Sequence, residues 1–282
     1  MTTAPRPFTF EMLDAITEAW KRPDPPAPAV ETGFFTDTTL CIGCKACEVA
    51  CKQWNQLPGD GFNWTGNSYD NTVSLSATTW RHVAFIEQMD GNGQPPRWLM
   101  MSDVCKHCVQ APCQEACPTG SLIYNEFGNV YLQQDICNGC AYCVVACPFG
   151  VLDRNKQDGG AHKCTLCYDR QKDAMTPACA KACPTASIQF GPIEELREKA
   201  RRRVDELHAR GEDDAWLYGA EPAGEYSALN SFFLLKDEPG VYNLPAAPKR
   251  PAAHLKANYL ASFAAALGMA AISAFCFAKE RR

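Results

Sequence analysis

Four blocks of cysteine constrain the fold of this chain more than any other feature of its sequence. Each block opens with two cysteines separated by two residues and closes with two separated by three residues, whereas the middle gap is two, four, two and eleven residues in successive blocks. The cysteines of the blocks are Cys41, Cys44, Cys47 and Cys51; Cys105, Cys108, Cys113 and Cys117; Cys137, Cys140, Cys143 and Cys147; and Cys164, Cys167, Cys179 and Cys183. The remaining cysteine, Cys276, lies in an apolar stretch, where we expect a small buried side chain and not a ligand.

This spacing is typical of iron–sulfur ligation. A loop with cysteines three positions apart can wrap three corners of a 4Fe-4S cube, while the fourth cysteine, beyond the three-residue gap, is better placed to reach a second cube. Three of the blocks are followed by a proline, Pro118, Pro148 or Pro184, which turns the chain away. We therefore expect the blocks to work in pairs and to hold four 4Fe-4S clusters.

Zinc ions and disulfides are the alternative uses of so many cysteines. Zinc sites usually present two separated cysteine pairs, and disulfide frameworks belong mainly to short secreted chains, whereas this chain has 282 residues. Its five histidines do not cluster, and the sequence has no phosphate loop, nucleophile elbow or conspicuous carboxylate pair. The sequence therefore predicts iron–sulfur clusters and no catalytic residue.

The pairing of the blocks is left open by the spacing alone, but adjacency favours the second with the third, which leaves the first with the fourth. The ligand sets predicted under this pairing are Cys41, Cys44, Cys47 and Cys183; Cys51, Cys164, Cys167 and Cys179; Cys105, Cys108, Cys113 and Cys147; and Cys117, Cys137, Cys140 and Cys143. The expected fold is α+β, with two nested ferredoxin-like 2x(4Fe-4S) units, loop insertions and a C-terminal single transmembrane helix.

The charge balance excludes one large class of partner. With 27 Lys+Arg against 32 Asp+Glu, the chain lacks the basic excess of a nucleic-acid-binding protein. Thiolate-bound clusters add negative charge, which buried sites must offset with amides and cations. The candidate cations in or near the blocks are Lys45, Lys52, Lys106, Lys163, Arg154 and Arg170. The alternative is that these are ordinary solvated side chains.

The chain divides into six segments. They are an N-terminal arm, 1–33; the first block with an insertion, 34–104; an inner ferredoxin-like unit, 105–163; the last block, which completes the outer unit, 164–191; an amphipathic helix and proline-rich connector, 192–256; and a transmembrane anchor and tail, 257–282. No secretory or twin-arginine signal is evident in the arm. Its Phe10, Leu13, Ile16 and Trp20 share one face at helical spacing, which predicts a short helix that packs on the body, with packing on a partner as the alternative.

Local patterns predict several smaller elements. The cysteine-free insertion, residues 52–104, indicates loops and short strands, and the sequence around residues 125–129 predicts a hairpin. Apolar residues recur at three and four between Gly191 and Gly211, which predicts an amphipathic helix. The three arginines at 201–203 fit a solvated face better than the alternative of anionic lipid binding.

One stretch near the C-terminus is long and apolar enough to cross a membrane. Residues 260–278 contain no charge, and a span requires roughly 17–25 residues. The alternative, favoured by its many alanines, is a helix buried against protein. Three Lys or Arg residues precede the stretch and three follow it, so charge does not indicate the orientation.

The blocks and their surroundings resemble a known family. Four such blocks in this order are similar to the iron–sulfur (beta) subunits of the molybdopterin oxidoreductases, and CIGCKACEVACKQWN, CPFG, KCTLCYDR and ELHARGEDDAWLYG resemble most closely those of membrane-bound formate dehydrogenases. Two departures separate it from other members. Nitrate reductase beta subunits have Trp in place of the cysteine at Cys140, and dimethyl sulfoxide and polysulfide reductase subunits generally lack a C-terminal anchor.

The resemblance implies an electron-transfer subunit without catalysis of its own. Electrons would pass from a catalytic alpha subunit with a molybdenum or tungsten bis-pterin site, through four 4Fe-4S clusters, to a membrane cytochrome b (gamma) subunit and quinone. The chain would lie at the cell membrane, with its head outside the cytoplasm as is common in the family or inside it as in some relatives. The alternatives are the same role in another molybdopterin oxidoreductase and, more remotely, a zinc-binding scaffold.

Overall fold

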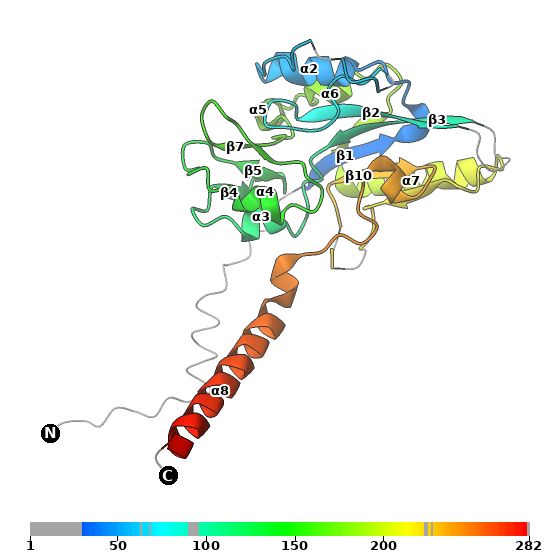
Figure 1. The fold of residues 1–282 in the computed structure, drawn as a ribbon. Coiled ribbons are helices and arrows are strands. Elements are labelled where there is room, and N and C mark those ends of the chain that lie inside the picture. Colours follow the sequence, from blue (N-terminus) through cyan, green and yellow to red (C-terminus); the bar gives the residue numbers. More distant parts are fainter. Residues whose placement is uncertain are drawn as a thin grey trace.

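The structure is a computed structural model that describes residues 30–62, 64–67, 69–89, 96–222, 225–226 and 228–280. The predicted N-terminal helix with Phe10 and Trp20 lies outside these residues. Figure 1 shows a head that contains the cysteine blocks, from which one long helix, α8 (orange to red), projects.

A four-stranded sheet lies at the centre of the head and joins distant parts of the chain. Its order is β8-β1-β10-β9, in which β1 is parallel to β10 and antiparallel to β8, and β9 is antiparallel to β10. The strands are β1 (Thr32–Asp37), β8 (Ile188–Pro192), β9 (Trp216–Tyr218) and β10 (Ser231–Leu235). Thus the residues before the first block pair with those after the last one.

The two faces of this sheet bury different partners, as the alternation of side chains along a strand requires. Phe34 and Phe233 join the core that contains most of the cysteines. Phe35 and Phe232 stack on each other, with 5.4 Å between ring centroids, in a second core with α7 (Ile193–His208). Phe34 and Phe35 are fully buried, so β1 separates the cysteine region from α7.

Helix α7 confirms the amphipathic helix expected after the last block. Its Leu196 and Ala200 are buried, while Arg201 and Arg202 on its outer face pair with carboxylates of Glu221 and Glu198 at 2.6 and 2.9 Å. Arg203 instead reaches Asp37, at 3.0 Å. Arg201 and Arg202 agree with a solvated face, whereas the expectation is wrong for Arg203, because Asp37 at the end of β1 is buried and draws its guanidinium onto the sheet.

The insertion after the first block forms longer strands than its sequence indicated. β2 (Arg81–Gln88) and β3 (Arg97–Val104) are antiparallel over eight residue pairs. Val83 and Met101 are buried here because α2 and the cysteine region cover one face of the pair. The tertiary cover, which sequence periodicity alone does not reveal, stabilises the long pairing.

Short helices and hairpins carry the cysteine blocks. The helices are α2 (Ala46–Trp54), α3 (Pro112–Glu115), α4 (Tyr142–Ala146), α5 (Tyr168–Lys172) and α6 (Ala178–Lys181). α2 of the first block packs on α6 of the last, and α3 of the second block packs on α4 of the third. The hairpins are β4 (Leu122–Tyr124) with β5 (Val130–Leu132), as predicted, and β6 (Asp153–Arg154) with β7 (Ala161–His162), which the sequence did not indicate.

The C-terminal connector leads to a helix that nothing else in the described chain covers. The connector contains the 3-10 turns η2 (Pro239–Tyr242) and η3 (Pro251–His254), and α8 spans Leu255–Glu280. Residues 251–277 are long and apolar enough to cross a membrane, and their most apolar stretch is not buried at all, which disagrees with a helix buried in this chain. Cys276 is therefore exposed on α8, and the expectation of a buried side chain is wrong.

The base of α8 lies beside the second cysteine block. The guanidinium Nε of Arg250 is 3.3 Å from the carboxylate of Glu115 in α3, and η3 contacts the same helix. Since α3 and α4 pack together, the helix leaves the head near the second and third blocks, away from α2 (Figure 1).

Candidate iron–sulfur sites

The structure brings the sixteen block cysteines together in four groups of four. We name them site 1 (Cys41, Cys44, Cys47, Cys183), site 2 (Cys51, Cys164, Cys167, Cys179), site 3 (Cys105, Cys108, Cys113, Cys147) and site 4 (Cys117, Cys137, Cys140, Cys143). The cysteines of site 1 line one cavity. The assignment of these groups as the ligand sets of four clusters stays a prediction.

The pKa values of the thiols reflect how close the thiols lie to one another. Burial is the largest cause that raises the pKa of Cys51, of Cys108 and of Cys143, and the charges of the other three cysteines of the same site raise each pKa further. The pKa of Cys143 rises to about 11. Since every cysteine is a free thiol, each group presents four sulfur donors.

One backbone conformation recurs at the start of all four blocks. The residue before the second cysteine has a positive φ in each block: Gly43 (64°), His107 (42°), Gly139 (70°) and Leu166 (53°). A Cβ on Gly43 would lie 2.5 Å from the ring of Phe85, and one on Gly139 would lie 2.2 Å from a carbonyl oxygen, so these two positions require glycine. The repeated loop curls the chain so that the flanking cysteines face the same centre.

Hydroxyl groups supply hydrogen bonds to several sulfurs. The Ser102 hydroxyl lies 3.3 Å from Cys47 Sγ in site 1, and the Ser121 hydroxyl lies 3.3 Å from Cys117 Sγ in site 4. Burial raises the pKa of Cys117, but hydrogen bonds, of which that of Ser121 is the strongest, lower it to about 6. Such bonds to sulfur also tune the potential of a bound cluster.

Two of the six cations expected near the blocks are almost fully buried. Lys106 and Lys163 are 1% and 2% exposed, and each follows or precedes a block cysteine directly. Burial raises the pKa of Cys113, and the positive charge of Lys163 acts against that increase. Lys163 therefore offsets negative charge at site 3.

The other four expected cations have partners other than the sulfurs, although the charge of buried Arg170 also acts against the burial that raises the pKa of Cys167. Lys45 pairs with Glu48 and Asp70, and Lys52 pairs with Asp60. Arg154 is exposed and donates to a backbone carbonyl, while the Arg170 guanidinium lies over the Trp54 ring at 4.2 Å. Lys45, Lys52 and Arg154 are thus mainly structural or solvated, whereas Arg170 also places positive charge near site 2.

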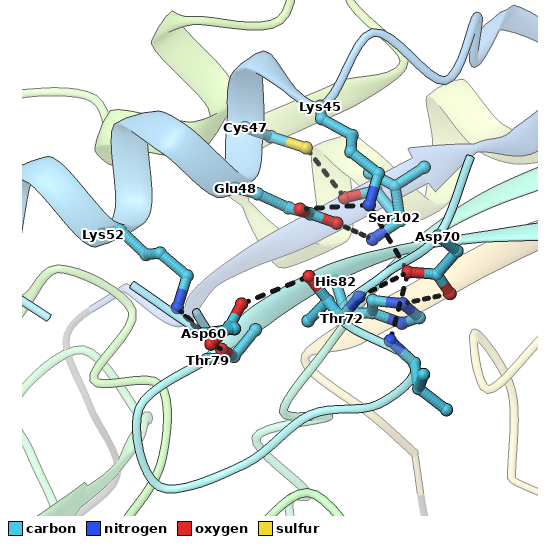
Figure 2. Close-up of polar contacts among 12 residues, drawn as sticks. Lys45, Cys47, Glu48, Lys52, Asp60, Asp70, Thr72, Thr79, His82 and Ser102 are labelled. Carbon is cyan, nitrogen blue, oxygen red and sulfur yellow. Dashed lines mark hydrogen bonds and ion pairs between the residues drawn. The ribbon is translucent and has the colours of Figure 1, made fainter. Parts of the chain in front are cut away.

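A polar network, which the sequence reasoning missed, anchors the first block to the insertion (Figure 2). Glu48 of α2 accepts a hydrogen bond from the backbone N–H of Val83 in β2. Asp70 lies 2.8 Å from the buried ring of His82 and 3.4 Å from Lys45. Burial raises the pKa of Asp70, but the charge of His82 and hydrogen bonds produce a net lowering. The network holds α2, and with it Cys47 and Cys51, against β2.

Pairs of neighbouring thiols join consecutive sites into a row. The pairs are Cys47 with Cys179, between sites 1 and 2; Cys164 with Cys105, between sites 2 and 3; and Cys113 with Cys143, between sites 3 and 4. Burial is the largest cause of the raised pKa of the first thiol in each pair, and the charge of the second contributes. These pairs link site 1 to site 2, site 2 to site 3, and site 3 to site 4.

The row reaches the surface at both ends. Cys44 of site 1 and Cys140 of site 4 are exposed, whereas the cysteines of site 2 are all buried. Apolar side chains are exposed next to each end, including Val49 near site 1 and Val145 near site 4. An exposed end with apolar surroundings is suited to contact with another protein.

The donor sets and the buried cations fit iron–sulfur clusters. Four thiols lie near one another at each site. Arg81, which is 1% exposed, lies near thiols of sites 1 and 2, and its Nε and Nη2 atoms lack a hydrogen-bond partner among the described residues. A buried, incompletely paired guanidinium is costly unless negative charge lies close to it. Thiolate-bound clusters would provide that charge at both sites.

Comparison with known proteins places these sites in a recognised group. Two family models described as 4Fe-4S dicluster domains match residues 40–121 and 96–193. The chain is 40% identical over 223 residues to the iron–sulfur subunit of nitrate-inducible formate dehydrogenase from Escherichia coli, which covers 78% of this chain and 74% of the relative. It is also 40% identical over 253 residues to the iron–sulfur subunit of formate dehydrogenase-O from the same organism, and this match covers 86% of this chain and 82% of the relative.

A more distant relative belongs to a different reductase. The B subunit of anaerobic dimethyl sulfoxide reductase from Escherichia coli is 35% identical over 174 residues, which covers 59% of this chain and 76% of the relative. The similarity to the formate dehydrogenase subunits therefore extends over more of the chain.

Proposed function

Because the chain belongs to the family of formate dehydrogenase iron–sulfur subunits, we propose that it relays electrons within a formate dehydrogenase complex through four 4Fe-4S clusters at sites 1–4. The observation that carries this proposal is the row of four thiol groups with exposed ends. When bound, each cluster supplies a one-electron carrier. The chain itself holds no catalytic residue in this proposal.

The proposed architecture has two nested units. Sites 1 and 2 form an outer unit from segments 34–104 and 164–191, and sites 3 and 4 form an inner unit from segment 105–163. The packing of α2 on α6 and of α3 on α4 supports this division. In each unit the last cysteine of one block joins the first three of the other, as in two-cluster ferredoxins.

The residues around the sites would maintain the relay. The cysteines hold iron as thiolates, Lys163 and Arg81 offset negative charge, and the core around the buried sites excludes water. The terminal segments 192–256 and 257–282 would serve as support and membrane anchor, and the arm 1–33 as an additional contact.

The position of α8 supports a direction for the relay. Its base contacts α3, so the inner unit lies toward the proposed membrane and site 1 lies at the far end (Figure 1). We infer that site 1 receives electrons from the pterin-bearing catalytic alpha subunit, with molybdenum or tungsten, and that site 4 delivers them to a membrane cytochrome b subunit and quinone.

Formate itself provides the test. Adding formate to the anaerobic complex, purified through this chain in detergent, should bleach the visible absorption of the iron–sulfur sites and produce paramagnetic signals. Zinc analysis of the same sample addresses the scaffold alternative. A complex that contains iron but does not respond to formate would contradict the proposed substrate.

The similarity to the dimethyl sulfoxide reductase subunit supports a second candidate, in which the same relay serves another molybdopterin oxidoreductase. In that case the dithionite-reduced complex should be reoxidised by dimethyl sulfoxide and remain unreduced by formate.

A truncation tests the proposed anchor. Removing the residues after 250 should release the head from the membrane fraction, because α8 provides the exposed apolar surface. Retention of the truncated head on protein-free lipid vesicles would contradict this role.

A further inference from the structure

Arg81 occupies an unusual position for a charged residue. It opens β2, is 1% exposed, and lies opposite Val104 of β3. Its Nη1 atom donates a hydrogen bond to the Ser102 hydroxyl at 3.0 Å, and this hydroxyl lies 3.3 Å from Cys47 Sγ. The guanidinium carbon is 4.8 Å from the centre of the Phe34 ring. A serine thus connects the cation to a sulfur of site 1.

No carboxylate in the described residues forms a salt bridge with Arg81. The Nε and Nη2 atoms are buried without a hydrogen-bond partner in that part of the chain. Since guanidinium remains charged in proteins, this cation requires a negative environment.

The negative environment comes from two different sites. Burial lowers the pKa of Arg81, but the charges of Cys179, Cys47, Cys164 and Cys51 raise it, with a net upward shift. Cys47 belongs to site 1 and the other three belong to site 2. Arg81 therefore lies near thiols of both sites of the outer unit, and Ser102 joins it to Cys47 of site 1.

The buried lysines near the blocks differ from Arg81 in their partners. Lys106 pairs with Asp103, so its charge is partly neutralised by a carboxylate. Lys163 donates to the carbonyl oxygens of Val130 and Cys164. Arg81 has neither a carboxylate nor a full set of acceptors in the described residues, which leaves its charge directed at the sulfurs.

We propose that Arg81 is a positioning residue whose fixed charge, held by Ser102 near sites 1 and 2, raises the reduction potentials of both clusters of the outer unit. This inference rests on the proposed function, since it requires clusters at those sites. A nearby cation stabilises the extra electron of a reduced cluster, and local charge and hydrogen bonds are recognised determinants of cluster potential. The charge comes from a strand of the insertion and not from a cysteine block.

The test compares neutral and charged substitutions in the full chain. Arg81→Gln and Arg81→Met remove the charge, and Met also avoids burying unpaired polar atoms, whereas Arg81→Lys retains it. Arg97→Gln is the matched control, because Arg97 lies at the other end of the β2–β3 pair and binds Asp214 and Asp237. Iron content is measured first, and the four midpoint potentials are then determined by anaerobic titration with a low-potential reductant that adds one electron per cluster, followed by paramagnetic resonance.

The charge role predicts a selective shift. In Arg81→Gln and Arg81→Met, two of the four midpoint potentials should fall by at least about 59 mV, which corresponds to a tenfold decrease in the equilibrium constant for one-electron reduction. Arg81→Lys should restore most of this shift, and Arg97→Gln should match the wild type. If the neutral variants lose the outer clusters while Arg81→Lys keeps all four, the result supports the inference, because the outer clusters then need a positive charge at position 81 in order to assemble.

Several results would overturn the inference. The first two are unchanged midpoint potentials in a neutral variant that holds all four clusters, and equal shifts of all four potentials. The third is a shift in Arg81→Lys as large as that in the neutral variants. The fourth is loss of clusters in all three variants, which would assign Arg81 to packing. A wild-type chain without four clusters would overturn the proposed function and this inference together. Four clusters in the wild type with one of the preceding results would overturn this inference alone.

Discussion

The outer and inner units contain the same kind of cysteine site but obtain their positive charge differently. In the inner unit, the charge comes from two lysines next to block cysteines: Lys106 follows Cys105, and Lys163, which precedes Cys164 of the outer unit, acts on Cys113. In the outer unit, Arg81 comes from β2, a strand far from either of that unit's blocks. A cysteine motif therefore encodes the ligands of a site, whereas the charge around the site depends on which strand the fold places beside it.

The largest expected effect comes from breaking the row in the middle rather than at its end. Cys164→Ser removes a buried ligand of site 2, next to Cys105 of site 3, so formate should reduce site 1 and leave sites 3 and 4 oxidised. Cys140→Ala removes an exposed ligand of site 4, so formate should still reduce sites 1–3. Paramagnetic resonance spectra of each variant, recorded after the addition of formate and after the addition of dithionite, show which clusters are reduced.

Dithionite serves as the control in that experiment because it reaches every retained cluster directly. Formate reduction of sites 3 and 4 in a Cys164→Ser complex that has lost site 2 would show that the sites do not act in series.

A smaller effect is expected from the network that holds α2 against β2. Asp70→Asn weakens the contacts with His82 and Lys45 and should destabilise the outer unit by about 1–3 kcal/mol, the usual cost of leaving a buried partner unsatisfied. The inner unit lies outside this network and should retain its iron. Iron loss during urea titration of the two proteins gives the measurement.

The contribution of Asp70 should also depend on pH. Its pKa is lowered in the folded chain, so its stabilising effect is present above its unfolded pKa of about 3.9 and is lost as pH falls through the folded value. Bleaching rates of wild type and Asp70→Asn should therefore differ above about pH 3.9 and converge as the pH falls below it and through the lower folded pKa. A constant ratio of the two rates over this range would contradict the assignment.

The smallest effect compares equivalent serine contacts in the two units. Ser102→Ala and Ser121→Ala each remove a hydroxyl 3.3 Å from a sulfur, but only Ser102 also binds Arg81. Ser121→Ala should lower the midpoint potential of site 4 by a free energy of about 1 kcal/mol. Ser102→Ala should lower the midpoint potentials of both outer sites, with the larger shift at site 1, because it also releases Arg81. Potentiometric titration measures the shifts, and a larger shift in Ser121→Ala would indicate that Arg81 does not need Ser102.

The sequence predicts those features that depend on neighbouring residues. The hairpin of β4 and β5 and helix α7 follow from local spacing, because a turn or a helix face is determined within a few residues. The spacing inside each block predicts its cysteines as ligands, whereas the pairing of the blocks was chosen by adjacency along the chain. Lys106 and Lys163 were candidates because they adjoin cysteines.

Features that depend on tertiary partners were not predictable in this way. Arg81 and His82 resemble ordinary polar residues until β2 is covered by α2 and the cysteine region, which buries both. The four-stranded sheet likewise joins β1 with β8 and β10, whose residues lie far apart in the sequence. Chain spacing contains no signal for such contacts.

The central claim is that one chain holds four clusters on these sixteen cysteines. The most direct measurement is the iron, sulfide and spin count of the anaerobically purified full chain, before and after complete reduction. We predict roughly sixteen irons, an equal amount of sulfide and about four unpaired spins per reduced chain. A fully occupied chain with half that iron and spin, or with zinc in place of iron, would contradict this claim.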